Sequence, residues 1–256
     1  MSDVSELRDG LRREALRVYL RYAEEFVEHF NLCRRGEDGR HGGSVKIESR
    51  IDDEAQLEVV ERLGEDEHGE VGMMVMPLGS LADDDPAKLP DALRTGQSAR
   101  AFKKAVARLR ERHAFTHNGT PPMALAAFHP DAEANLETGS RLVPYIRRSP
   151  DPTIQCVRLS VLAEMRRGTD QGTDYVDLSK VNLQELLAKK RRPPLHERVA
   201  AQNLEIFQEI GVERAEAVLA DIHRDRDESY ARLLARLAES HASGLGGHSL
   251  GEKNAG

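Results

Sequence analysis

Apolar residues recur at intervals of three and four over residues 5–30, with arginine and glutamate between them, and this spacing predicts a helix. Asn31 and the glycine-rich stretch 36–43 end it. The same spacing predicts a helix over 91–114 and another over 153–167. Helical periodicity therefore accounts for much of the chain before its composition is considered.

The C-terminal part predicts two more helices. One opens after Pro193-Pro194 and runs to Ile210, and Gly211 is its stop, because glycine readily adopts the left-handed conformation that ends helices. Residues 212–240 predict a last, highly charged helix. The end of the chain is rich in glycine and serine, which is typical of a disordered tail.

Three short segments have the patterns of strands. Ser44–Ser49 alternates as a half-buried strand does, whereas Val71–Leu78 and Pro122–Phe128 are apolar runs typical of buried strands. A short acidic helix is predicted within residues 52–70. The expected fold class is α+β: a small, mostly three-stranded sheet with helices packed mainly on one face, plus N- and C-terminal helices.

The 256 residues are enough for one large domain or two small ones. We expect a single α+β domain over 5–213, a charged C-terminal helix over 214–241 and a disordered tail over 242–256. Residues 129–152 carry four prolines, and their apolar residues follow no clear periodicity, so we predict a long ordered loop there. Loops of that length in compact domains usually serve function.

Composition excludes some classes of protein. The net charge of −7 argues against a nucleic-acid-binding protein that needs a broad basic face. No apolar run reaches the roughly 18 residues of a membrane span, and the charged N-terminus lacks the apolar segment of a secretory signal. Cys33 and Cys156 lie too far apart in sequence for a metal-binding CxxC motif. We expect a cytoplasmic protein with no membrane or nucleic-acid partner.

Phe128-His129-Pro130-Asp131 begins just after the third predicted strand, where side chains at strand ends commonly face a ligand crevice. His129 is predicted as a general acid or base oriented by Asp131, or as a metal ligand. With His196 the pair also has the outline of a two-histidine, one-carboxylate iron site. A haem would be non-covalent, since the chain has no CxxCH motif. The alternative is that both residues cap the strand end and a turn.

Two further segments carry candidate chemistry. Cys33 precedes several arginines, which would lower the pKa of its thiol and favour a nucleophilic or redox thiolate, although a free cysteine is often only a small buried residue. Arg148 leads into the helix predicted to start at Thr153, whose backbone N–H groups could hold a carboxylate or phosphate together with Arg158. Helix capping by Asp151 or Thr153 is the alternative.

Taken together, these motifs resemble a bacterial family known as domain of unknown function 1415, over about residues 5–213. The resemblance is carried, in order along the chain, by Asn31-Leu32-Cys33, Phe128-His129-Pro130-Asp131, Arg148-Ser149-Pro150-Asp151-Pro152, and Asn203 with Gly211. It implies site roles for Cys33, His129, Asp131, Arg148 and Arg158, and places Asn31, Ser149 and Asn203 among the substrate-binding residues.

This chain departs from the family pattern at several positions. Arg34 follows Cys33 where the family has proline, and Gln155 stands where a histidine is expected. Leu159 and Ser160 stand where acidic residues are expected, and Ala201-Gln202 stands where Glu-Arg is expected. Roles that depend on those family residues do not carry over, and the family implies no particular reaction.

The leading functional hypothesis is an enzyme that acts on a small anionic metabolite, with His129 and Asp131 as acid and base and the arginines as the anion site. A metal- or haem-dependent, oxygenase-like redox enzyme with His129 as ligand is the second. The third is a non-catalytic interaction protein whose charged helices 5–30 and 196–240 pack against another chain. A homo-oligomer is compatible with each of them. Convergence of His129, Cys33 and Arg148 would favour an enzyme.

Overall fold

Long helices and short strands alternate along the chain. A computed structural model describes residues 2–32, 45–49, 55–66, 68–77, 98–133, 137–168 and 195–245. In chain order its elements are α1 (Ser2–Arg21), the π-helix η1 (Tyr22–Glu28), β1 (Val45–Ser49), α3 (Ala55–Glu65), β2 (Val71–Val75), α5 (Ala99–Thr116), β3 (Met123–Phe128), α6 (Gly139–Ile146), β4 (Thr153–Arg158), α7 (Leu159–Gly168), α9 (Leu195–Ile210) and α10 (Val212–Leu245). The three predicted strands are confirmed as β1, β2 and β3.

The sheet has four strands rather than three, in the order β1-β2-β4-β3. β1 and β2 are connected by the helix α3 and pair in parallel. β4 lies between β2 and β3 and is antiparallel to both. The α+β class is therefore confirmed, and the extra strand occupies the middle of the sheet.

The prediction of a helix from Thr153 is wrong over its first six residues, which form β4. Helix begins only at Leu159, in α7. The apolar residues Ile154, Val157 and Val161 matched a helical spacing, but a central strand covered on both faces also carries apolar residues on both sides. Pairing with β2 and β3 therefore overrides the local pattern.

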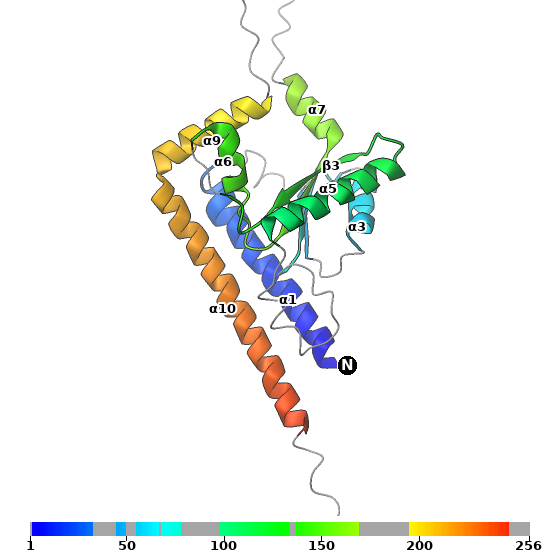
Figure 1. The fold of residues 1–256 in the computed structure, drawn as a ribbon, viewed down its shortest axis with the longest axis vertical. Coiled ribbons are helices and arrows are strands. Elements are labelled where there is room, and N and C mark those ends of the chain that lie inside the picture. Colours follow the sequence, from blue (N-terminus) through cyan, green and yellow to red (C-terminus); the bar gives the residue numbers. More distant parts are fainter. Residues whose placement is uncertain are drawn as a thin grey trace, which may run out of the picture.

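Helices cover both faces of the sheet, not mainly one (Figure 1). Met73 and Val75 of β2 belong to a core with α1, η1, α6, α9 and α10. Met74 and Met76 belong to a second core with α3 and α5. Successive side chains of a strand point to opposite faces, so one short apolar run supplies two cores.

The N- and C-terminal helices α1 and α10 lie side by side in Figure 1. The Arg17 guanidinium donates two hydrogen bonds to the Asp225 carboxylate, at 2.8 and 2.9 Å, and Arg21 donates a third at 2.6 Å. The hydrogen bond from Arg17 is the main cause that lowers the pKa of Asp225 to about 2. The interaction hypothesis expects these two helices to pack against another chain. Instead, they pack against each other within this chain.

The predicted loop 129–152 contains a helix, α6, which the sequence analysis missed. Thr138 is its N-cap and accepts a hydrogen bond from the backbone N–H of Arg141 at 3.3 Å. Pro144 lies inside the helix and weakens its periodic signal. The predicted loop is therefore two short segments, one on each side of α6.

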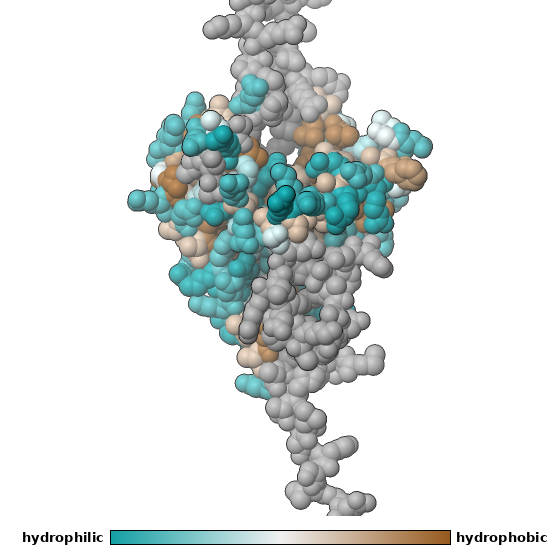
Figure 2. Space-filling view, in the orientation of Figure 1, coloured by the Kyte–Doolittle hydropathy of each residue, from teal (hydrophilic) through white to brown (hydrophobic). Residues whose placement is uncertain are grey.

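The ends of the helices follow their predicted signals. Asn31 has a φ of +52° and Gly211 a φ of +82°, the left-handed conformation that ends a helix. α10 continues to Leu245, so the first four residues of the predicted tail are helical and 246–256 lie outside the described residues. Among the described helices, no stretch combines the length and the apolarity needed to cross a bilayer. Figure 2 shows hydrophilic side chains over α5 and α10 on the viewed face.

Candidate functional site

The two segments that flank α6 meet at one end of the β3–β4 pair. Phe128 ends β3 opposite Thr153, where β4 begins. The backbone N–H of His129 donates to the carbonyl of Arg147 at 2.9 Å, and Arg148 Nε donates to the carbonyl of Ala132 at 3.1 Å. The motifs around His129 and Arg148 therefore lie against each other, as the enzyme hypothesis requires.

The C-terminal helix α10 holds the second of these segments. Arg148 Nη1 donates to Glu216 Oε1 at 3.0 Å, and the Tyr230 hydroxyl donates to Asp151 Oδ2 at 2.7 Å. Arg226 donates to the carbonyl of Pro150. Residues of α10 that follow the predicted domain 5–213 thus supply three of the contacts around this motif.

His223 lies on the same side of α10 as Glu216, two turns further along. Its Nε2 is buried and has no hydrogen-bond partner in the described part of the chain. Burial is the main cause that lowers the pKa of His223 to about 4, and the charges of Arg226 and Arg148 act in the same direction. His223 was not among the predicted site residues, and its signal in the sequence was its place beside the apolar residues of a charged helix.

The polar residues of this region are named the motif cluster: His129, Asp131, Arg148, Glu216 and His223. Within it, the Asp131 carboxylate does not orient His129. His129 Nδ1 accepts a hydrogen bond from the backbone N–H of Asp131 at 3.1 Å, whereas the carboxylate Oδ2 is 3.9 Å away on a side chain that is 82% exposed. A neutral imidazole that accepts at Nδ1 carries its proton on Nε2. The backbone therefore selects the tautomer of His129.

Ser149 supports the loop from within. It is fully buried, and its hydroxyl donates to the carbonyl of Asp151 at 2.6 Å. The hydroxyl of Thr153 donates to the same carbonyl at 2.9 Å. Ser149 was predicted to bind substrate, but its hydroxyl is committed to the loop backbone.

Arg158 lies at the opposite end of β4 from Thr153, about 17 Å away for five residues of strand. Its guanidinium donates to the carbonyls of Gly69, Gly64, Leu63 and Asp66, at distances from 2.5 to 3.2 Å. Two of these carbonyls, those of Leu63 and Gly64, belong to the last turn of α3, where a cation is favoured, and Asp66 directly follows the helix. The predicted anion site of Arg148, a helix start at Thr153 and Arg158 is therefore wrong, because Arg158 caps α3 and Thr153 begins a strand.

The remaining predicted residues lie apart from the motif cluster or outside the described residues. Asn31 is exposed at the end of η1. Asn203 is buried on α9, one turn before Phe207, which packs against Tyr145 with ring centres 5.1 Å apart. Cys33 lies outside the described residues. Cys156 is buried in the sheet, and burial raises the pKa of its thiol to about 12, so it is not a reactive thiolate.

Within the part of the chain that the structure describes, His129 does not belong to a group of three potential metal ligands. Among the described side chains, the group of three that could hold an ion is Glu61, His113 and His117, between α3 and α5. Burial acts to raise the pKa of Glu61, but hydrogen bonds from the two histidines outweigh it and bring the pKa below its ordinary value. Neither histidine was predicted as a ligand. His113 lies at the end of the helix predicted over 91–114, and the four-residue spacing from His113 to His117 was a usable signal.

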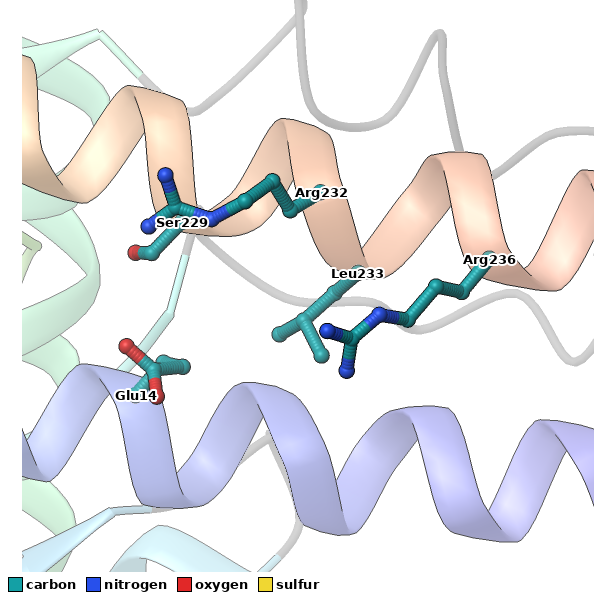
Figure 3. Close-up of a pocket in the computed structure, with 5 residues that line it drawn as sticks. All are labelled: Glu14, Ser229, Arg232, Leu233 and Arg236. Atoms are coloured by element: carbon teal, nitrogen blue, oxygen red, sulfur yellow. The ribbon is translucent and has the colours of Figure 1, made fainter.

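A small pocket of about 110 Å³ lies between the two terminal helices (Figure 3). Glu14 of α1 faces four residues of α10 across it, namely Ser229, Arg232, Leu233 and Arg236. The pocket includes none of the residues predicted to bind or transform a substrate. It therefore does not mark the site that the motifs indicate.

Comparisons with protein-family models, with curated proteins and with solved structures find no match for this chain. The resemblance to domain of unknown function 1415 therefore remains a prediction.

Proposed function

We propose that this protein is an enzyme that acts on a small anionic molecule at the motif cluster. The observation that carries the proposal is that the segments of His129 and Arg148 meet, near His223 of α10, whose pKa responds to the charges of Arg148 and Asp131. The buried Nε2 of His223 has no hydrogen-bond partner in the described part of the chain. Unpartnered buried polar groups are costly, so they are retained chiefly where they have a task. The chemistry that two imidazoles supply best is proton transfer.

Arg148 is the residue that would bind the anion. Its Nε and Nη1 donate to Ala132 and Glu216, whereas Nη2 has no hydrogen bond to the described part of the chain. The guanidinium lies over the ring of Tyr145, 5.4 Å from its centre, which holds its plane. A carboxylate or phosphate would take the open edge and compete with Glu216, whose side chain is 45% exposed.

The two alternatives have less support. A metal ion at His129 would need further ligands, and the group of potential metal ligands found among the described residues does not include His129. A non-catalytic protein that uses its terminal helices for a partner would leave their apolar faces open. Instead, Leu11 and Val18 of α1 share one core with Leu219 and Ile222 of α10.

The proposal is tested by binding and turnover together. Purified protein is mixed with inorganic phosphate, a phosphomonoester, a dicarboxylate and a tricarboxylate, while thermal unfolding and proton NMR follow stabilisation and consumption of each compound. We expect at least one anion to raise the melting temperature by a few degrees, because it binds only the folded state. His129→Gln and His223→Gln should each abolish consumption of that compound.

His68→Gln is the matched control, because His68 is an exposed histidine outside the motif cluster. It should leave both binding and turnover unchanged. Equal consumption of the compound by the wild-type protein and by folded His129→Gln and His223→Gln variants would contradict the proposal.

A further inference from the structure

Two histidines at the C-terminal end of α5 and one glutamate on α3 face one another on the side of the sheet opposite α1. His113 lies in the last turn of α5, and His117 is the C-cap residue that follows the helix. His113 and His117 are four residues apart, which places both side chains on one side of the helical chain. Glu61 comes from the preceding helix, 52 residues before His113. Because the third residue is far away in sequence, only the packing of α3 on α5 completes the group.

The carboxylate of Glu61 lies between the two imidazoles. His113 Nδ1 is 2.9 Å from Glu61 Oε1, and His117 Nε2 is 2.5 Å from Glu61 Oε2. One ligand atom from each of the three residues lies within 4.8 Å of the others. Ligand atoms around a tetrahedral zinc with bonds of 2.0–2.1 Å are about 3.3 Å apart, so small side-chain rotations would suffice.

Burial differs among the three residues in a way that suits a metal site. The side chain of His113 is fully buried, whereas those of His117 and Glu61 are 33% and 24% exposed. Packing therefore holds one ligand in place, while the other two can adjust and leave a path for an ion to enter. The rings of His113 and His117 meet edge to face, with centres 4.9 Å apart.

We propose that Glu61, His113 and His117 bind a divalent transition metal ion of the zinc type, with water in a remaining coordination position. Two imidazole nitrogens and one carboxylate oxygen are the donors of the zinc sites that keep an open position. The mixed nitrogen and oxygen donors disfavour calcium and magnesium, which prefer oxygen alone. A bound ion would tie the end of α5 to α3.

This site is separate from the motif cluster. The ring of Phe102, in the first turns of α5, is 5.8 Å from the ring of His129. His113 lies eleven residues further along the same helix, which corresponds to about 17 Å. The two sites are therefore near opposite ends of α5, and the metal site does not depend on the proposed enzymatic function.

The test uses the full chain without an affinity tag, treated with a chelator and then titrated with Zn²⁺ or Co²⁺. We expect one equivalent of either ion to bind, the melting temperature to rise by several degrees with zinc, and cobalt to give a visible absorption band. His117→Ala and Glu61→Gln should each weaken binding by roughly tenfold or more. These two side chains are partly exposed, so both variants should fold.

His68→Ala is the matched control, an exposed histidine outside the group, and it should bind metal as the wild type does. The proposal is overturned if the wild-type chain binds neither ion in the micromolar range. It is equally overturned if His117→Ala and Glu61→Gln keep wild-type affinity, because the ion then binds at other residues. A metal-free His117→Ala variant with the wild-type melting temperature would show that its loss of binding is not a loss of fold.

Discussion

At the scale of single residues, Arg148 and Arg158 show how much depends on the backbone between them. A helix from Thr153 would advance 1.5 Å per residue and bring Arg158 within about 8 Å of the helix start. The strand β4 advances about 3.3 Å per residue and doubles that distance. Each arginine therefore has its own partners, a carboxylate and a carbonyl for Arg148 and helix-end carbonyls for Arg158.

His223 should make the stability of the protein depend on pH. Burial lowers its pKa from 6.5 to about 4, so between these values the unfolded chain binds a proton that the folded chain does not. The contribution of His223 to the free energy of unfolding is complete above pH 6.5 and is lost as the pH falls toward 4. We expect about 2 kcal/mol of loss between pH 7 and pH 5, and His223→Leu should remove it. Urea unfolding at both pH values measures the difference.

The corresponding control is His68→Leu, which replaces an exposed histidine. It should lose as much stability between pH 7 and pH 5 as the wild type does. A His223→Leu variant with the same loss as the wild type would show that another group causes the pH dependence.

At the scale of elements, the contact between α6 and α9 decides the effect of a small substitution. Alanine normally stabilises a helix relative to glycine by about 1 kcal/mol. A Cβ at Gly139 would lie 2.5 Å from the backbone oxygen of Ala200, which cannot move without displacing α9. We expect Gly139→Ala to lower the free energy of unfolding by about 2 kcal/mol, as overpacking does. Chemical denaturation monitored by circular dichroism measures the change.

Gly10→Ala in α1 is the matched helical control. Its Cβ would lie 3.1 Å from the end of the Leu233 side chain, which can rotate away. Gly10→Ala should therefore be neutral or slightly stabilising, because no clash with backbone atoms opposes the higher helix propensity of alanine. Equal effects of the two substitutions would contradict the role given to the α6–α9 contact.

At the scale of the whole molecule, the C-terminal helix is part of the main core. Four of its residues are buried there, namely Ala215, Leu219, Ile222 and Tyr230. Burying a leucine or isoleucine contributes about 2 kcal/mol, and a domain is stable by only about 5–15 kcal/mol in total. A chain that ends at Gly211 should therefore lose most of its stability and its cooperative urea transition at 25 °C.

Asp225→Asn separates the packing of α10 from its ion pairs. It weakens the bonds to Arg17 and Arg21 but leaves the buried residues in place. The ion pairs are partly exposed to solvent, so we expect a loss of only about 1 kcal/mol and a cooperative transition. If a chain ending at Gly211 unfolds at the same urea concentration as the intact protein, α10 does not contribute to the stability of the fold.

The sequence by itself determined the α+β class, the three strands β1, β2 and β3, and the helices at both ends. It also singled out His129 and Arg148 as candidate site residues, although their meeting is a result of the tertiary structure. These features follow from periodicity and from glycine and proline signals, which are properties of a few neighbouring residues.

Only the tertiary structure decided the rest. It made Thr153–Arg158 a central strand, turned Arg158 toward the end of α3, and brought His223 and Glu216 to the motif cluster. It also joined Glu61 to His113 and His117. Each of these outcomes depends on contacts between residues far apart in the chain. A local pattern carries no information about which distant elements will cover a segment, and burial on both faces makes a strand resemble a helix.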